Sequence, residues 1–432
     1  MSSEERTYSV KMLARVEGEG RFRLELDEHD QVIDARLEIF EAPRFFEAFL
    51  RGRSLFEVPD IVARICGICP IAYQTSATRA LERILGIDPL PPAIRDLRRL
   101  MYCGEWIESH ALHVFMLHAP DFLGYASAIE MAADHKPLVE RGLLLKKIGN
   151  AIVELLGGRA VHPVSPRVGG FSRAPTPEQL QPLRAQLARG LELADETVDW
   201  TASLACPDFE QDYVFVALAG DRYPIEFGDE LAITGRGRVP VDEFPEHFDE
   251  HQAAHSNALQ CRLRDGTPYL VGPLARINHF AEQLHPRALA ALERVGLRLP
   301  VCNPYRSIVV RAIEIVHAFA EAIDIIEGYT AQAEPYIEGT VRAGSASGCS
   351  EAPRGICWHR YEIDDEGLIL DARIVPPTSQ NQARIEQDLI GLAPQLLALD
   401  HASATSRCEQ LIRSYDPCIS CATHFLKLEI ER

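Results

Sequence analysis

Apolar residues recur at three- and four-residue spacing through much of the chain. This spacing predicts helices that bury one face, because residues three or four apart lie on the same side of a helix. The pattern is broadest between residues 308 and 326, where isoleucine, valine and phenylalanine would cover too much of a helix for it to stand exposed. The helices predicted in this way cover residues 44–55, 76–85, 93–118, 138–156, 177–204, 306–332 and 383–399.

Alternation of polar and apolar residues marks the expected strands. They lie within residues 7–40, chiefly at 21–26 and 32–40, at 357–363 and 368–375, and in short runs between 212 and 280. The runs on either side of residues 364–367 predict a hairpin, and the turn-rich stretch 212–280 predicts a β-rich insertion. Residues 376–381 begin with two prolines, and we expect an irregular loop there.

Composition narrows the class of protein. The chain has 432 residues, 47% of them hydrophobic, which is enough for a large buried core. A net charge of −19 argues against a nucleic-acid partner, since binding phosphates needs a basic face. No apolar run predicts a membrane span, and the polar residues 1–6 lack the core of a signal peptide. Eleven scattered cysteines, an odd number, predict a reducing cytoplasmic location rather than a disulfide scaffold.

Four of these cysteines form two matched Cys-x-x-Cys pairs, Cys66 with Cys69 and Cys418 with Cys421. Three interpretations are open. A structural zinc site would be unusual, because zinc ribbons place their pairs about 15–20 residues apart, whereas here the separation is 418 − 69 = 349 positions. Two independent redox dithiols would need a thioredoxin-like unit, which neither motif opens. The third interpretation is a buried metal centre clamped between distant parts of the chain, since thiolates are the soft ligands that late transition metals prefer.

The motifs around both pairs resemble those of the large, catalytic subunit of nickel–iron hydrogenases. Arg-Ile-Cys-Gly-Ile-Cys stands at residues 64–69, and Asp-Pro-Cys-x-x-Cys-x-x-His stands at residues 416–424. Further matching segments lie at residues 15–18, 44–47, 158–163, 351–355 and 377–378. The resemblance implies an α+β fold, mostly α, in which a long central helix bundle carries peripheral β hairpins. It also implies that residues 1–432 form a single large-subunit domain.

The resemblance implies a bimetallic site and its chemistry, the reversible cleavage of H₂ into protons and electrons. Nickel would be held by all four thiolates, with Cys66 and Cys418 terminal on nickel. Cys69 and Cys421 would bridge nickel to an iron that carries one CO and two cyanides. Cleavage of H₂ also needs a base, and the thiolate of Cys418 can serve as one.

Other matched positions carry expected roles as well. Pro353, Arg354 and Thr378 are expected beside the cofactor, where the guanidinium and the hydroxyl would donate to cyanide ligands. The always-charged Arg354 would also polarise H₂. Glu17 matches the carboxylate that carries protons outward from the terminal thiolate.

The resemblance adds a second metal site and a processing step. Glu47, His424 and the backbone carbonyl near Ile374 match the ligands of a structural cation, usually magnesium, which prefers oxygen ligands. Residues 425–432 would be a peptide that a maturation endopeptidase removes after nickel insertion. The alternative is an ordinary tail that stays.

The sequence departs from the family pattern at three positions. Tyr73 and Glu19 stand where the family often has histidine, and Ser109 stands where it often has aspartate. The short chain and its Cys-Pro-Ile-Ala-Tyr sequence are more similar to the cytoplasmic, NAD(P)-linked branch.

That branch implies a set of partners. They are a small subunit with iron–sulfur clusters and diaphorase subunits that bind flavin and NAD(P), because this chain has no dinucleotide-binding glycine motif of its own. An H₂-sensing homologue and a zinc-stabilised structural protein remain as alternatives. A respiratory-complex relative would have lost the four cysteines.

Overall fold

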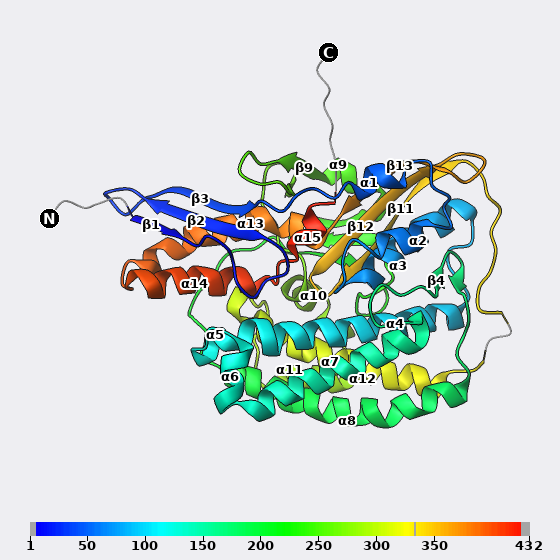
Figure 1. Cartoon of the computed structure of the whole chain (residues 1–432), viewed down its shortest axis with the longest axis horizontal. Helices are drawn as coiled ribbons and strands as arrows, with labels where there is room; N and C mark the ends of the chain where they lie inside the picture. Colours follow the sequence, from blue (N-terminus) through cyan, green and yellow to red (C-terminus); the bar gives the residue numbers. More distant parts are fainter. Residues whose placement is uncertain (1–5, 332–333, 425–432) are drawn as a thin grey trace, which may run out of the picture.

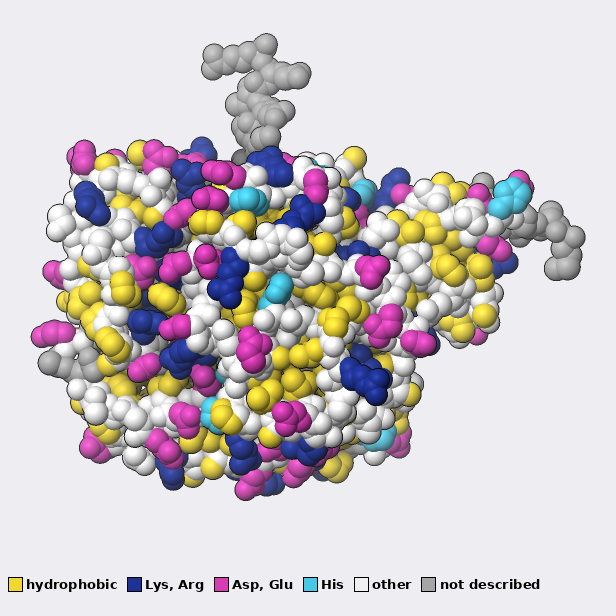
Figure 2. Space-filling view, turned by 180° about the vertical axis from the view of Figure 1, so that it is seen from behind, with side chains coloured by type: hydrophobic (Ala, Val, Ile, Leu, Met, Phe, Trp, Pro, Cys, Tyr) yellow, Lys and Arg dark blue, Asp and Glu magenta, His cyan; other side chains and the backbone are white. Residues whose placement is uncertain are grey.

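The computed structural model of the chain describes residues 6–331 and 334–424. The expected cleavable peptide 425–432 therefore lies outside the described residues. Long helices occupy one side of the molecule and small sheets the other (Figure 1). On the face opposite to that view, acidic and basic side chains are interspersed with apolar ones (Figure 2). Within the described ranges, no helix is both long and apolar enough to cross a membrane.

The helical side is built from four long helices. These are α4 (Pro92–Ala111), α7 (Lys136–Gly157), α8 (Pro177–Ala202) and α12 (Ser307–Gly328). Helix α12 packs against both α4 and α8, and α7 packs against the same two. Because α12 is surrounded, its broad apolar surface is buried, as the sequence predicts. Shorter helices complete this side: α5 (Ala119–Leu123), α6 (Ala128–Asp134), α10 (Pro273–Phe280) and α11 (Pro286–Arg294).

Two of the three three-stranded antiparallel sheets in the described residues lie on the sheet side. One contains β1 (Arg6–Ser9), β2 (Gly20–Leu26) and β3 (Val32–Ile39), and the other contains β11 (Gly344–Ala352), β12 (Gly355–Ile363) and β13 (Ile369–Val375). The β12–β13 pairing confirms the predicted hairpin. Helix α3 (Pro70–Leu85) packs on β11 and β12, and α13 (Pro377–Leu396) packs beside β3.

Residues 212–280 contain strands, as expected, and end in a helix. The strands are β6 (Val216–Ala219), β7 (Glu230–Ile233), β8 (Gly237–Pro240), β9 (Phe248–Gln252) and β10 (Leu259–Leu263). The last eight residues form α10 instead of β structure. Phe244 stacks on Trp358 of β12 with ring centroids 4.8 Å apart, so this region shares a core with the second sheet.

Two predicted elements are wrong in detail. Residues 44–55 form not one helix but a short α1 (Phe46–Leu50), and α2 (Val58–Val62) follows, because Gly52 turns the chain with φ of +77°. Residues 376–381 are not an irregular loop. Pro377 is the first residue of α13, a position that suits proline since its missing N–H would have no helical partner there. The helix predicted over 93–118 continues past Ala111 as a π-helical turn, Leu112–His118.

Candidate metal centre

The fold brings the two cysteine pairs together. Cys66 and Cys69 precede α3. Cys418 is the N-cap of the short α15 (Ile419–Ala422) near the C-terminal end of the described chain, and Cys421 lies within that helix. The sulfur atoms of Cys66 and Cys418 lie 3.4 Å apart, those of Cys69 and Cys421 lie 3.6 Å apart, and those of Cys418 and Cys421 lie 2.9 Å apart. All four sulfurs lie within 4.8 Å of one another. Each side chain is at least 97% buried, so the expected convergence of the four thiols is confirmed.

Arg44 ties the two cysteine loops to each other. Its guanidinium donates to the backbone carbonyl of Ile65 at 2.6 Å and to that of Ser420. Its backbone N–H donates to the carbonyl of Thr423 at 2.6 Å. One residue thus spans segments that are more than 350 positions apart in the sequence, which fixes the distance between the pairs.

Glu105 on α4 caps the helix that follows the first pair. Its carboxylate accepts the backbone N–H groups of Ile71 at 2.7 Å and Ala72 at 3.2 Å, two donors that the first turn of α3 leaves unpaired. Burial raises the pKa of Glu105. Glu105 therefore fixes the start of α3 and with it the direction in which Cys69 enters the site.

The donor set and its surroundings fit a soft metal. Four converging sulfurs would hold nickel or another late transition metal. Burial raises the pKa of Cys418, whereas the hydrogen bond between Cys66 and Cys418 is the main cause that lowers the pKa of Cys66. A Cys₄ set alone would also suit structural zinc. However, a closed structural zinc site needs neither a carboxylate hydrogen-bonded to one of its sulfurs nor a guanidinium close enough for the cysteines to influence its pKa, and this site has both.

The carboxylate is Glu17. The thiol of Cys418 donates to Glu17 Oε2 at 3.0 Å, and the same oxygen accepts the backbone N–H of Ser420 at 3.0 Å. The carbonyl of Glu17 also accepts the N–H of Ile419 at 2.9 Å. Glu17 is partly exposed, so it stands between the buried sulfur and the outside.

The guanidinium is that of Arg354, in the tight turn between β11 and β12. Its Nε donates to the carbonyl of Asp416 at 2.7 Å and its Nη2 to Asp416 Oδ1 at 2.9 Å. Its Nη1 lies 3.4 Å from the hydroxyl of Ser109, so this departure from the family pattern sits directly at the guanidinium. Burial disfavours the charge, but Asp416, followed by Cys418, outweighs burial and raises the pKa of Arg354.

Thr378 and Pro353 also lie at the centre. The backbone N–H of Cys418 donates to the hydroxyl of Thr378 at 3.0 Å, in the first turn of α13. The carbonyl of Pro353 accepts a hydrogen bond from Arg276 at 3.0 Å. The structure thus places all the predicted residues of this site in one region.

The residues of the expected second metal site gather nearby. Glu47 Oε1 accepts the N–H of Ile374 at 2.7 Å and lies 3.6 Å from Nε2 of His424, while the same ring nitrogen lies 2.5 Å from the carbonyl of Ile374. Burial opposes the charged form of His424, but the hydrogen bond and charge of Glu47 outweigh burial and raise its pKa. A carboxylate, a carbonyl oxygen and an imidazole at one point form a donor set that fits a hard cation.

Sequence reasoning missed three residues that build the centre: Arg44, Glu105 and Asp416. Arg44 and Asp416 lie inside the motifs at residues 44–47 and 416–424, but the motifs alone indicate no role for either. Glu105 lies within a helical pattern that gives no sign of its partner. A carboxylate among apolar helix positions was the available signal, because a buried charge must find a partner.

Comparisons with known proteins agree with this geometry. The family described as nickel-dependent hydrogenase matches residues 44–141 and 265–424, and a family described as HoxL-like matches residues 10–42. The chain is 36% identical to sulfhydrogenase 2 subunit alpha of Pyrococcus furiosus, across 96% of this chain and 98% of that protein. It is 27% identical to the NAD-reducing hydrogenase HoxS subunit beta of Cupriavidus necator, across 96% and 94%. A solved NAD⁺-reducing [NiFe]-hydrogenase in the H₂-reduced state superposes with a TM-score of 0.88 at 27% identity, covering 97% of this chain and 99% of that one.

Proposed function

This chain belongs to the nickel-dependent hydrogenase family, as a catalytic large subunit, and we propose that it cleaves H₂ reversibly and passes the electrons towards NAD(P). The observation that carries the proposal is the set of four buried sulfurs with a carboxylate in hydrogen-bonding contact with one of them. Cys66 and Cys418 would bind nickel terminally, and Cys69 and Cys421 would bridge nickel to iron. When bound, the nickel–iron centre, with its CO and cyanide ligands, would accept the electrons of H₂.

The chain's own residues would handle the proton. The sulfur of Cys418 is the expected first base, and it lies within hydrogen-bond distance of Glu17 Oε2, at 3.0 Å. Glu17 would take this proton and release it outward, since hydrogen-bond distance is the first requirement for a general base. The N–H of Ser420 fixes the accepting oxygen. The Glu17 carboxylate is therefore already positioned to accept the proton.

The remaining residues of the site would orient the groups bound there and exclude bulk water. Arg354 would hold its positive charge over the open side of the centre, and Asp416 fixes the guanidinium plane through two contacts. A guanidinium does not lose its proton in the working pH range, so its field is constant. Thr378 and Pro353 would line the pocket for the diatomic ligands. Burial of the cysteines keeps bulk water away from the sulfurs.

Infrared spectroscopy of the purified enzyme with its partner subunits, paired with metal quantification, tests this function. We expect sharp CO and cyanide stretching bands together with about one nickel per chain, because one four-sulfur site holds one such metal. Zinc without these bands would overturn the hydrogenase proposal in favour of a structural site.

The proposed electron acceptor is NAD(P), reached through an iron–sulfur small subunit and diaphorase subunits that bind flavin. The proposal is supported by the similarity to the NAD-reducing relatives and by the lack of a dinucleotide-binding glycine motif in this sequence. H₂-dependent reduction of NAD⁺ and NADP⁺ by the purified assembly tests it. Reduction of a viologen dye without reduction of either nucleotide would contradict this acceptor and leave H₂ cleavage intact.

We propose that Glu47, His424 and the carbonyl of Ile374 hold magnesium. A ligand that binds only the folded state stabilises it by about 2.7 kcal/mol at a hundred times its Kd, so chelation with EDTA is expected to lower the Tm by a few degrees. Adding Mg²⁺ should restore it. In a Glu47→Gln variant the Tm should start low and no longer respond to either reagent, whereas Asp371→Asn, an exposed carboxylate of β13, should behave like the unmodified protein.

An equal EDTA response in the Glu47→Gln variant would show that the cation binds elsewhere.

We also propose that residues 425–432 are removed by a maturation endopeptidase. Intact-mass analysis of the enzyme carrying nickel tests this, since retention of the eight residues would make them an ordinary tail.

A further inference from the structure

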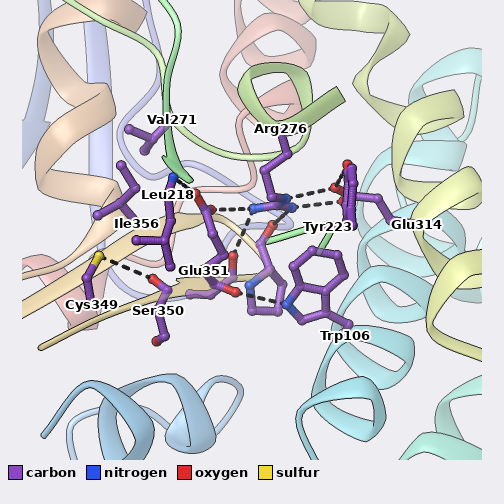
Figure 3. A network of polar contacts seen from close by, with 12 residues as sticks. Trp106, Leu218, Tyr223, Val271, Arg276, Glu314, Cys349, Ser350, Glu351 and Ile356 are labelled. Carbon is purple, nitrogen blue, oxygen red and sulfur yellow. Dashed lines mark hydrogen bonds and ion pairs between the residues drawn. The ribbon is translucent and has the colours of Figure 1, made fainter. Parts of the chain in front are cut away.

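Arg276 on α10 is the centre of a buried polar network that links α10 to α12 and β11 (Figure 3). Its Nε and Nη2 donate to the two carboxylate oxygens of Glu314, each at 2.8 Å, and its Nη1 donates to Glu351 at 2.8 Å. All three side chains are fully buried. The guanidinium also lies over the ring of Trp106, 4.4 Å from the centroid. Every face of Arg276 is therefore engaged within the protein.

The same guanidinium holds the turn that carries Arg354. Arg276 Nη1 donates to the carbonyl of Ala352 at 3.1 Å, and Nη2 donates to that of Pro353 at 3.0 Å. These are the two residues directly before Arg354. Trp106 adds a hydrogen bond from its indole N–H to the carbonyl of Glu351 at 2.9 Å.

Gly272 closes the other side of the turn. It has φ of +111°, and a Cβ on it would lie 2.6 Å from the carbonyl oxygen of Arg354. The turn thus has little room to move. A small displacement of Arg276 would be transmitted to the backbone of Arg354 directly.

Helix α12 holds two groups that position Arg354: Arg276, which binds the turn before it, and Asp416, which binds its guanidinium. Glu314 holds Arg276, and Arg311, one turn earlier on the same face of the helix, lies 3.6 Å from Asp416. Arg311 Nη1 also lies 3.4 Å from the carbonyl of Pro353. One rigid helix therefore contacts the turn before Arg354 and the carboxylate that Arg354 binds.

Stability alone does not account for this network. Taking two carboxylates and a guanidinium out of water is costly, and apolar residues of similar volume often stabilise a core as well or better. What a bidentate pair provides is direction, because the planar fork of an arginine fits a carboxylate in one geometry. Fixed direction matters most where a nearby group must stay aimed at a reacting centre.

We propose that Arg276 is a positioning residue for Arg354: anchored on Glu314 of α12, it fixes the backbone of residues 352–353 and so the height of the Arg354 guanidinium over the four sulfurs. This inference rests on the proposed function, in which Arg354 faces the nickel–iron centre. Arg276 itself contacts none of the four cysteines in any of its hydrogen bonds and ion pairs within the described chain. Its effect would be transmitted through Arg354.

The test is Arg276→Lys in the complete enzyme, with Arg98→Lys as the matched control. Lysine keeps the charge but has no fork, so it cannot hold Glu314, Glu351 and two carbonyls at once. Arg98 also forms a bidentate pair, with the buried Glu82 at 2.8 and 2.6 Å, and donates to a backbone carbonyl at 3.1 Å, although its own side chain is 10% exposed. The two variants therefore remove the same kind of contact.

Three readouts are compared: the positions of the CO and cyanide infrared bands, the amide exchange of residues 351–355, and kcat. For Arg276→Lys we expect shifted bands at unchanged nickel content, faster exchange in the turn, and a fall in kcat of roughly tenfold to a hundredfold, as misplacement by about 1 Å produces. For Arg98→Lys we expect a lower Tm only.

The outcomes separate the two proposals. If the unmodified enzyme has the bands but Arg276→Lys leaves bands and exchange unchanged, Arg276 is a structural residue and the inference fails. If Arg98→Lys shifts the bands equally, general destabilisation explains both and the inference also fails. If the unmodified enzyme has no such bands, the proposed function fails, while faster exchange of residues 351–355 in Arg276→Lys would still support the fixing of backbone residues 352–353 by Arg276.

Discussion

Replacing Cys66 by serine is expected to remove nickel and abolish H₂ cleavage. The Cys66 sulfur lies 3.4 Å from that of Cys418 and closes the four-sulfur set. A hydroxyl is a hard, weakly acidic donor and does not replace a soft thiolate. Since changes that affect only the partners of metal ligands cost about 10–100-fold in metal affinity, loss of a ligand should exceed that range. Nickel content by mass spectrometry and H₂ uptake measure the effect.

Cys408→Ser is the control for this variant. Cys408 is also fully buried, but it lies on α14 (His401–Ser414) and does not belong to the four-sulfur group. It should lose stability, because a hydroxyl is buried in place of a thiol, yet keep its nickel. Full nickel content and full turnover in Cys66→Ser would show that Cys66 is not a nickel ligand.

Glu17→Gln is expected to lower turnover by about 10²–10⁴-fold, the usual contribution of a positioned acid or base. A glutamine oxygen can still accept the N–H of Ser420, but the amide cannot take the proton that Cys418 donates at 3.0 Å. Nickel content and the CO and cyanide bands should therefore stay unchanged while kcat falls. This separates a defect in proton transfer from a defect in assembly.

Glu19→Gln provides the matched comparison two residues away. The Glu19 side chain is exposed, and the variant should retain full turnover. Equal loss in both variants would indicate that the turn itself matters, and normal turnover in Glu17→Gln would mean that protons leave Cys418 by another route.

The features that the sequence predicts are those that repeat locally or belong to short motifs. The apolar surface of α12 and the alternation in β12 and β13 each reflect burial of one side of one element. Each cysteine pair can be recognised in the sequence because its two residues form a short Cys-x-x-Cys motif. Their convergence could not be derived from spacing alone, and it was expected because of the family resemblance.

The supporting network was not predictable, for a physical reason. Arg276, Glu314 and Glu351 stand on three different elements, and nothing near each residue indicates its partner. Strand β11 was missed because its sequence is rich in glycine, serine and alanine, which have little strand preference. It forms because it is covered by α3, where a Cβ on Gly348 would lie 2.2 Å from the carbonyl of Ser76.

The two wrong elements show the limits of turn residues as signals. The composition of the Pro-Pro-Thr-Ser-Gln-Asn stretch predicts a loop, but proline is also common in the first turn of a helix. That first turn places the hydroxyl of Thr378 against the backbone N–H of Cys418.

The distance between the two cysteine pairs along the chain also has a consequence during synthesis. Cys418 leaves the ribosome 352 residues after Cys66, which takes roughly 20–70 s at 5–20 residues per second. Throughout that interval the nascent protein offers a two-thiol site that copper or zinc would bind more tightly than nickel or about as tightly. The four-sulfur site can therefore form only after translation has passed the second pair.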